Sequence, residues 1–480
     1  MKNFILSVAV LAAMNGYPQT CTLSGQVADS SVKLTLLYAD QVYKTYEMQI
    51  GVNPEGRFKK SISLPYPVFA LLELGSLKRR LLLSPGRHLE INIDGSYAGK
   101  GAVENNLVHS GILDNTPSFT KNVTLRTWKD SIMNRVEKAV AQEAAAIEAA
   151  KMPAPLKKIL ISETKYAWQC YLNDFTSDDL RWAKNPDADS LAVLVMQWQP
   201  IPDSLTLVNG FYANMILQRH GRHNIQVFLR HKPVTKESFG AYLGMSYNKI
   251  DSLVRIHGEP GILGWLYTRN HAPAGIRDKM IYNSIVEATG ANDLSTATFL
   301  YQHMQKDHPG SNYLAAANKA MQQVKNAMES NAGNTGIRFN QAGGIHSLQE
   351  LVKPYAGKVV YLDIWGTWCG PCREQLQYAH ELKKRYAGKD VVFVYLDKDD
   401  QVREGIWKEY VYVAKLEGEH YRMSQEEIEG IWHSVKEAGN EQVHSYPTYV
   451  IIDRQGRVVH PNAERPGSRE KLYAQLDKLL

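Results

Sequence analysis

The sequence predicts a multidomain protein with a small antiparallel β-sandwich, an all-helical middle domain and a C-terminal α/β domain. Three observations lead to this architecture. The length of 480 residues exceeds what one hydrophobic core supports. The spacing of apolar residues changes along the chain from period two to period 3.6, and strand and helix patterns then alternate. The composition, with 44% hydrophobic and 22% charged residues, is ordinary for a globular protein.

The first residues have the features of a secretory signal. Lys2 supplies a basic start, residues 4–14 are apolar with one serine, and residues 15–18 read Asn-Gly-Tyr-Pro, which breaks a helix. We therefore expect a signal peptide over residues 1–20, with a buried N-terminal helix as the alternative. Export predicts a periplasmic or cell-envelope location. A lipid tether at Cys21 is a further alternative, although the residues before it depart from the bacterial lipoprotein pattern.

Charge and cysteine content restrict the classes of function. Lysine and arginine outnumber aspartate and glutamate by 55 to 49, and this small excess is spread along the chain. A nucleic-acid-binding surface requires concentrated positive charge, so we expect no nucleic-acid partner. The chain has four cysteines, too few for a disulfide-stabilised scaffold. They are Cys21, Cys170, Cys369 and Cys372.

Residues 21–110 are predicted to form the β-sandwich. In Val32–Leu36 apolar and polar residues alternate, as a half-buried strand requires. Similar short runs follow, separated by turn residues such as those of residues 53–56 and 84–86. These runs lie at 46–50, 58–64, 68–74, 80–83 and 89–93.

Residues 111–330 are predicted to be helical. An Ala- and Glu-rich segment places four apolar residues on one side of a long amphipathic helix, and prolines divide the rest into further helices. The four apolar residues are Ile132, Val136, Val140 and Ile147. We interpret Cys170 as a buried, inert thiol. Arginines and a lysine flank His220, His223 and His231, so we expect surface histidines there and no metal site.

Residues 331–480 are predicted to form the α/β domain, after a linker at 331–336. Strand patterns alternate with a helical one in this part of the chain. The predicted strands are Val359–Trp365, Val391–Leu396 and Thr448–Ile452, and the helix is Pro371–Tyr386. The segment Gln401–Gln442 is expected to add one or two helices, including Ser424–Glu437, which begins with a capping-box pattern.

The run Trp-Cys-Gly-Pro-Cys at residues 368–372 carries the predicted chemistry. A largely apolar strand leads into a short loop and then into a helix whose first turn contains Pro371 and Cys372. Unpaired N–H groups and the helix dipole stabilise an anion at that end. We expect Cys369 to be the nucleophile, with a pKa lowered to about 3.5 to 7.5. Cys372 is then the resolving thiol.

A Cys-x-x-Cys pair can also belong to a zinc site, a c-type haem attachment or a structural disulfide. A zinc site needs four ligands, and no second Cys-x-x-Cys is present. A c-type haem requires His directly after the second cysteine, where this chain has Arg373. A purely structural disulfide remains an alternative, although a loop this short constrains the unfolded chain little. We therefore predict neither a metal nor another cofactor.

Residues Trp365–Cys372 resemble the active-site segment of the thioredoxin superfamily, and the expected export makes the chain similar to its TlpA/ResA-like branch. The resemblance implies a C-terminal thioredoxin-like fold and a redox disulfide between Cys369 and Cys372. It also implies that Asp363, at the end of the central strand, takes the proton from the resolving cysteine. The alternative for Asp363 is an ordinary carboxylate at a strand end.

A second segment, Ser445–Asp453, resembles the family's other signature. The resemblance implies that the bond before Pro447 is cis and that the backbone of Tyr446 pairs with an extended peptide substrate. A trans proline is the alternative. Together with these two residues, the residues expected to support substrate binding are Trp368, Gly370 and Pro371.

The chain departs from the family at Gln377, where a proline commonly bends the active-site helix, so a straighter helix is expected. Gly366 and Thr367 also stand where Ala and a polar or charged residue are usual. Within the sandwich, residues 81–92 resemble an N-terminal domain of unknown function that precedes such redox domains in many exported Bacteroidota proteins.

The predicted function is that of an extracytoplasmic thiol-disulfide oxidoreductase that reduces or edits disulfides of exported proteins. Its expected partners are those protein thiols and disulfides, together with an unidentified membrane or periplasmic electron donor. The alternative is a cell-envelope binding or assembly protein with an accessory redox domain. A thiol peroxidase is a weaker hypothesis, because the peroxiredoxin arrangement is absent around Cys369.

Overall fold

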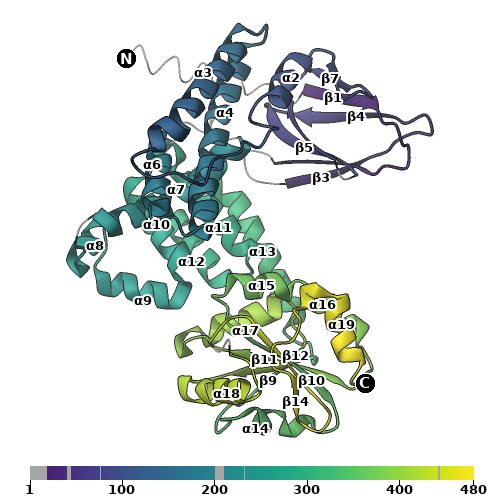
Figure 1. Ribbon diagram of the computed structural model, residues 1–480, viewed down its shortest axis with the longest axis vertical. Coiled ribbons are helices and arrows are strands. Elements are labelled where there is room, and N and C mark those ends of the chain that lie inside the picture. Colours follow the sequence, from purple (N-terminus) through teal and green to yellow (C-terminus); the bar gives the residue numbers. More distant parts are fainter. Residues whose placement is uncertain (1–18, 40–44, 76, 200–209, 232, 442–443) are drawn as a thin grey trace. The chain divides into compact units, whose positions relative to one another are not determined.

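The computed structural model describes residues 19–480 apart from 40–44, 76, 200–209, 232 and 442–443 (Figure 1). The expected signal segment therefore lies, except for its last two residues, outside the described residues. The chain separates into two compact units. One runs up to Pro233 and includes His271–Met280, and the other comprises Val234–Asn270 and Ile281–Leu480. Among the described residues, no helix is both long and apolar enough to cross a membrane.

Two four-stranded sheets begin the first unit, with strand orders β4-β1-β7-β8 and β3-β2-β5-β6. Leu23 and Leu36, one from each sheet, are fully buried in one shared core, so the sheets pack face to face. The elements are β1 (Gln19–Gln26), β2 (Leu34–Ala39), β3 (Thr45–Ile50), β4 (Arg57–Leu64), β5 (Val68–Leu74), β6 (Leu77–Leu83), β7 (His88–Ile91), β8 (Tyr97–Ala98) and the following helix α2 (Ala102–Ser110).

The expectation of a purely antiparallel sandwich is wrong for one pair of strands. β1 and β7 run parallel, with Leu23 opposite Leu89. Parallel neighbours need a long connection. Here the chain between them passes through strands of both sheets, and β5 and β6, which lie in the opposite sheet, come immediately before β7.

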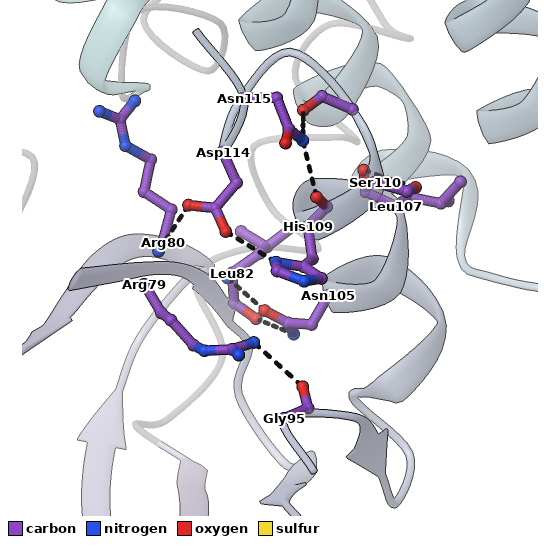
Figure 2. Close-up of polar contacts among 11 residues, drawn as sticks. Arg79, Arg80, Leu82, Gly95, Asn105, Leu107, His109, Ser110, Asp114 and Asn115 are labelled. Atoms are coloured by element: carbon purple, nitrogen blue, oxygen red, sulfur yellow. Dashed lines mark hydrogen bonds and ion pairs between the residues drawn. The ribbon is translucent and has the colours of Figure 1, made fainter. Parts of the chain in front are cut away.

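Helix α2 covers the edge strand β6 (Figure 2). The side chain of Asn105 accepts a hydrogen bond from the N–H of Leu82 at 2.8 Å and donates one to its carbonyl at 3.0 Å. After the helix, Asp114 accepts from the N–H of Arg80 at 3.4 Å and lies 2.8 Å from the ring of His109. These contacts satisfy backbone groups that an open sheet edge leaves unpaired.

Helices form most of the rest of the first unit. The predicted apolar stripe of four residues is buried, because its members all face the neighbouring helices. Cys170 is buried on α4, as predicted. The helices are η1 (Lys129–Met133), α3 (Asn134–Ala149), α4 (Ala154–Asp174), η2 (Phe175–Asp179), α5 (Leu180–Trp182), α6 (Ala188–Trp198) and α7 (Phe211–His231).

Helices also begin the second unit, which therefore contains part of the predicted middle domain. Helix α9 (Tyr247–His257) is capped by Gly258, whose φ of 86° suits a residue without a side chain. Helices α12 and α13 pack against α17 (Glu404–Val413). The helices in this part of the chain are α8 (Lys236–Leu243), α9 (Tyr247–His257), α10 (Glu259–His271), α11 (Ala274–Gly290), α12 (Leu294–Asp307) and α13 (Leu314–Asn331).

A six-stranded sheet of order β14-β13-β10-β11-β12-β9 forms the centre of the C-terminal part (Figure 1). Its four strands β10, β11, β12 and β9 run parallel, whereas β13 and β14 are antiparallel to their neighbours. The three strands predicted from the sequence are present. The strands are β9 (Ile337–Asn340), β10 (Val359–Trp365), β11 (Val391–Asp397), β12 (Gly418–Arg422), β13 (Thr448–Ile452) and β14 (Val458–His460).

Helices cover both faces of this sheet. α14 and α18 pack on the face of Val360 and Leu362, whereas α15, α16, α17 and α19 pack on the face of Tyr361 and Trp365. The predicted capping box at Ser424 is present at the start of α18. The elements are α14 (Leu348–Val352), η3 (Lys353–Tyr355), α15 (Gly370–Leu376), α16 (Ala379–Arg385), η4 (Gln401–Arg403), α18 (Gln425–Glu437), η5 (Pro466–Ser468) and α19 (Glu470–Asp477).

The expectation of a straighter active-site helix at Gln377 is wrong. The predicted single helix is divided into α15 and α16, and the break falls at Gln377 and Tyr378. The break contains no proline, and side chains beside it contact η5. Gln375 accepts a hydrogen bond from the N–H of Gly467 at 2.9 Å, and the ring of Tyr378 lies beside the same glycine.

Candidate functional site

Cys369 and Cys372 form a disulfide at the beginning of α15, with their Cα atoms 5.2 Å apart. Cys369 is the residue that caps the helix, and its sulfur accepts a hydrogen bond from the N–H of Cys372 at 3.1 Å. Gly370 and Pro371 form the intervening first turn. The site thus places a sulfur where the unpaired N–H groups of a helix favour negative charge.

The two sulfur-bearing residues differ little in exposure. Cys369 is 4% exposed and Cys372 is fully buried, so Cys369 is the more accessible of the two. Trp368, directly before it, is half exposed. The aromatic ring of Trp368 meets that of Tyr446 edge-on, with 5.1 Å between the ring centres.

The segment before β13 lies beside the cysteine pair. The peptide bond between Tyr446 and Pro447 is cis, as the family resemblance implies. Tyr446 packs against the cluster of buried residues that contains both cysteines, and its ring also contacts Trp432. The structure therefore brings the two sequence signatures together, although about 75 residues separate them in the chain.

Asp363 lies in the central strand β10, on the sheet face that α15 and α16 cover. Alternation along the strand puts Asp363 on the same side as Tyr361 and Trp365. Burial raises the pKa of this carboxyl well above its usual value, and the charge of Lys383 partly opposes the rise. Its Oδ1 atom has no hydrogen-bond partner among the described residues. The carboxyl therefore stands under the helix of the disulfide with one oxygen unused.

Lys383, on α16, is a buried ionisable group that the sequence did not reveal. Burial lowers the pKa of its amine to about 7, and the charges of Glu417 and Asp363 act in the opposite direction. Its amine donates a hydrogen bond to the carbonyl of Glu417 and lies 4.8 Å from the ring centre of Tyr395. In the sequence Lys383 is one of several basic residues at the end of a helix, which suggests exposure. Its burial near Asp363 becomes visible only in the fold.

A second network of buried charges holds the loop before the cysteines. The N–H of Thr367 donates to Asp399 at 3.3 Å, and the guanidinium of Arg403 donates to the hydroxyl of Thr367 at 2.9 Å. Burial raises the pKa values of Asp399 and Asp397, and the charge of Asp399 adds to the rise at Asp397. The network has no local signature in the sequence, because its partners lie more than 30 residues apart.

The histidine expectation is corrected for two residues. His220 is partly buried and His223 is buried on α7, so neither is a surface histidine. Burial lowers the pKa of His220 to about 4. The side chain of His231 lies outside the described residues. Within the described part of the chain, no three His, Cys, Asp or Glu side chains are grouped as a metal site requires.

The C-terminal part of the chain resembles known redox proteins. The Redoxin family profile matches residues 317–476. The thiol-disulfide oxidoreductase ResA of a Bacillus cereus strain is 31% identical over 128 residues, which are 27% of this chain and 67% of that protein. The thioredoxin of Bos taurus is 36% identical over 55 residues, which are 12% of this chain and 50% of that protein.

Solved structures give a similar match. The solution structure of a putative thiol-disulfide oxidoreductase from Bacteroides vulgatus is 30% identical and covers 27% of this chain and 77% of that chain, with a TM-score of 0.22.

Proposed function

The chain belongs to the thioredoxin superfamily, among its ResA-like thiol-disulfide oxidoreductases, and on this premise we propose that Cys369 and Cys372 are its reactive dithiol. The observation that carries the proposal is the disulfide at the N-terminus of α15, where the sulfur of Cys369 accepts the N–H of Cys372. The same donor stabilises a thiolate on Cys369 once the pair is reduced.

The reaction with a substrate disulfide has two exchange steps. The Cys369 thiolate attacks one substrate sulfur, a mixed disulfide forms, and the other substrate sulfur leaves as a thiolate. Cys372 then loses its proton and attacks the sulfur of Cys369. This closes the Cys369–Cys372 disulfide and releases the second substrate thiolate. Two electrons pass from the dithiol to the substrate, and a donor dithiol restores the reduced pair by the reverse exchange.

Asp363 is the proposed acceptor of the proton from Cys372. The support is its position on the sheet face under α15, its nearly complete burial and its raised pKa. Because its pKa is raised, this carboxylate is a stronger base than an ordinary aspartate, as a proton acceptor for a thiol must be. Trp368, Tyr446 and Pro447 are proposed to form the surroundings in which a substrate chain lies.

The proposed place of action is outside the cytoplasm, and the proposed substrates are disulfides of exported proteins. The ResA relatives and the sequence pattern of residues 1–18 support this. The tether at Cys21 is not part of the proposal. That residue is 1% exposed within the sandwich core, so a lipid on its sulfur would require β1 to leave the sheet.

Trapping of mixed disulfides tests the proposed function. In the Cys372→Ser protein the second exchange cannot occur, so Cys369 should accumulate substrate proteins as adducts that dithiothreitol releases. The matched control is Cys369→Ser, which retains one active-site cysteine and should trap nothing. Equal trapping by both variants would contradict the assignment of the attacking sulfur. Failure of the reduced wild type to cleave any disulfide would reject the function.

A further inference from the structure

Arg403 joins the reactive loop to a helix from the middle of the chain. The side chain is almost fully buried, and one end of its guanidinium donates to the hydroxyl of Thr367 at 2.9 Å. The other end donates to the carbonyl of Ile256, in the last turn of α9, at 3.2 Å. Because Thr367 stands two residues before Cys369, one side chain spans the distance between the disulfide loop and α9.

Further hydrogen bonds fix the two ends of this bridge. The last carbonyls of a helix have no partner within the helix. In α9 the carbonyl of Ile256 is capped by Arg403, and that of His257 accepts from the hydroxyl of Thr296 at 2.7 Å. On the other side, Asp399 accepts from the N–H of Thr367. The surface around the bridge is therefore preorganised, which lowers the cost of ordering it on binding.

Exposed apolar side chains belong to residues of this bridge or to their sequence neighbours. Among the described residues of the second unit, four large apolar side chains are markedly exposed. Val402 at 57% and Trp368 at 50% are sequence neighbours of Arg403 and Thr367, and Ile256 at 38% supplies the bonded carbonyl. The fourth, Leu480, is 38% exposed at the other end of the unit's sequence. Exposed apolar groups that collect at one place mark a binding surface.

We propose that Trp368, Val402 and Ile256 form a docking surface for apolar residues that flank the disulfide of a protein substrate. This substrate-flank surface rests on the proposed function and deepens it, because it gives α9 a part in substrate selection. A substrate sulfur must reach Cys369, which is only 4% exposed, so the chain on either side of that sulfur must lie against the surroundings of the disulfide.

The length of an extended peptide agrees with this occupant. An extended chain advances about 3.3–3.6 Å per residue, so residues two to four positions from the reacting cysteine lie about 7–14 Å away. The bridge begins at Thr367, two residues before Cys369, and continues through the two guanidinium hydrogen bonds of Arg403, of 2.9 and 3.2 Å, to α9. The preferred substrate therefore carries apolar residues two to four positions from its cysteine.

Two matched peptide disulfides test the proposal on the full chain. Each is a disulfide-linked dimer of one peptide, with leucine or with serine at the positions two to four residues from the cysteine. We expect the reduced wild type to cleave the leucine dimer with a kcat/KM about tenfold higher than that for the serine dimer, mainly because its KM is lower. The variants Val402→Ser and Ile256→Ser should each reduce that preference, and the control Leu480→Ser should retain it.

The outcomes separate this inference from the function beneath it. A wild type that cleaves both peptides equally well, or variants that keep the full preference, would overturn the docking surface and leave the redox function intact. A wild type that cleaves neither peptide nor the small disulfide of oxidised glutathione rejects the proposed function itself. A preference for the leucine peptide that appears only in kcat, with the same KM for both peptides, would also contradict docking.

Discussion

Two helices of this protein each hold a nearly inaccessible cysteine, and the two environments differ in what they do to a thiol. Cys170, on α4, is 1% exposed, and Cys369, at the start of α15, is 4% exposed. Burial raises the pKa of Cys170 to about 12, and its sulfur lies 3.6 Å from the carbonyl of Tyr212. A carbonyl accepts hydrogen bonds and so favours the protonated thiol.

The sulfur of Cys369 meets the opposite kind of partner. It lies at a helix N-terminus and accepts the N–H of Cys372, an arrangement that favours a thiolate, and the second sulfur is already within bonding reach. The difference teaches that burial alone makes a cysteine inert. Donors that compensate for burial, together with a second thiol, make it reactive.

The largest expected effect separates the two cysteines by turnover. Cys369→Ser should abolish reduction of a peptide disulfide, because no sulfur remains to form the mixed disulfide. Cys170→Ser should retain turnover within about twofold, since α4 contributes nothing to the exchange. Steady-state assays with dithiothreitol as electron donor measure both turnover rates. Substantial activity of Cys369→Ser would contradict the contrast between the two cysteines.

The next effect concerns Asp363. Asp363→Asn should slow resolution of the mixed disulfide by about 100-fold or more, as the loss of a general base does. The wild-type rate should rise with pH as the carboxyl ionises, and the variant should lack that rise. Asp390→Asn, which alters an exposed carboxylate in the same domain, is the matched control. A variant with the wild-type pH profile would exclude the proton-acceptor role.

The free energy of unfolding should also depend on the protonation of Asp363. Folding raises the pKa of Asp363, so the folded protein holds this proton more tightly than the unfolded chain. The resulting stability is complete below the unfolded-state pKa of about 3.9 and is lost as pH rises toward the folded-state value. Because asparagine stays neutral, the free energy of unfolding of Asp363→Asn, measured relative to the wild type by denaturant titration, should increase with pH.

The smallest effect is expected in the helix that carries Cys170. Cys170→Ala should lower the free energy of unfolding by about 1–2 kcal/mol through the cavity that it leaves, without changing turnover. Denaturant titration of the reduced protein measures this loss. A variant whose stability is unchanged while its turnover falls would give Cys170 a chemical role that its surroundings do not suggest.

The sequence sufficed for the parts that depend on local pattern. The apolar run of β10, the helix start at Pro371 and the capping box at Ser424 are each recognisable within a few residues. β12 escaped prediction because its buried residues include Glu419 and His420, which break the apolar alternation. Long-range pairing allows that burial, as Glu419 is held by two side chains of β9, those of Arg338 and Asn340.

Long-range contacts also explain why parts of the site could not be predicted from the sequence. Thr367 was noted only as a departure from the family, and nothing near Arg403 in the sequence indicates its two partners. One partner lies 36 residues away and the other 147 residues away. Similarly, the linker expected at 331–336 bonds to the C-terminal domain through Asn331 and Asn334. The predicted boundary at residue 330 therefore remains a prediction.

Alkylation of the reduced full-length protein at different pH values tests the central claim most directly. Iodoacetamide labelling followed by mass spectrometry measures the rate at each cysteine. The environments predict that Cys369 reacts first and reaches half its maximal rate below the ~8.5 of an unperturbed thiol, while Cys170 and Cys21 react only after unfolding. A half-maximal pH for Cys369 at or above that value, or native-state labelling of Cys170 at a similar rate, would contradict the account.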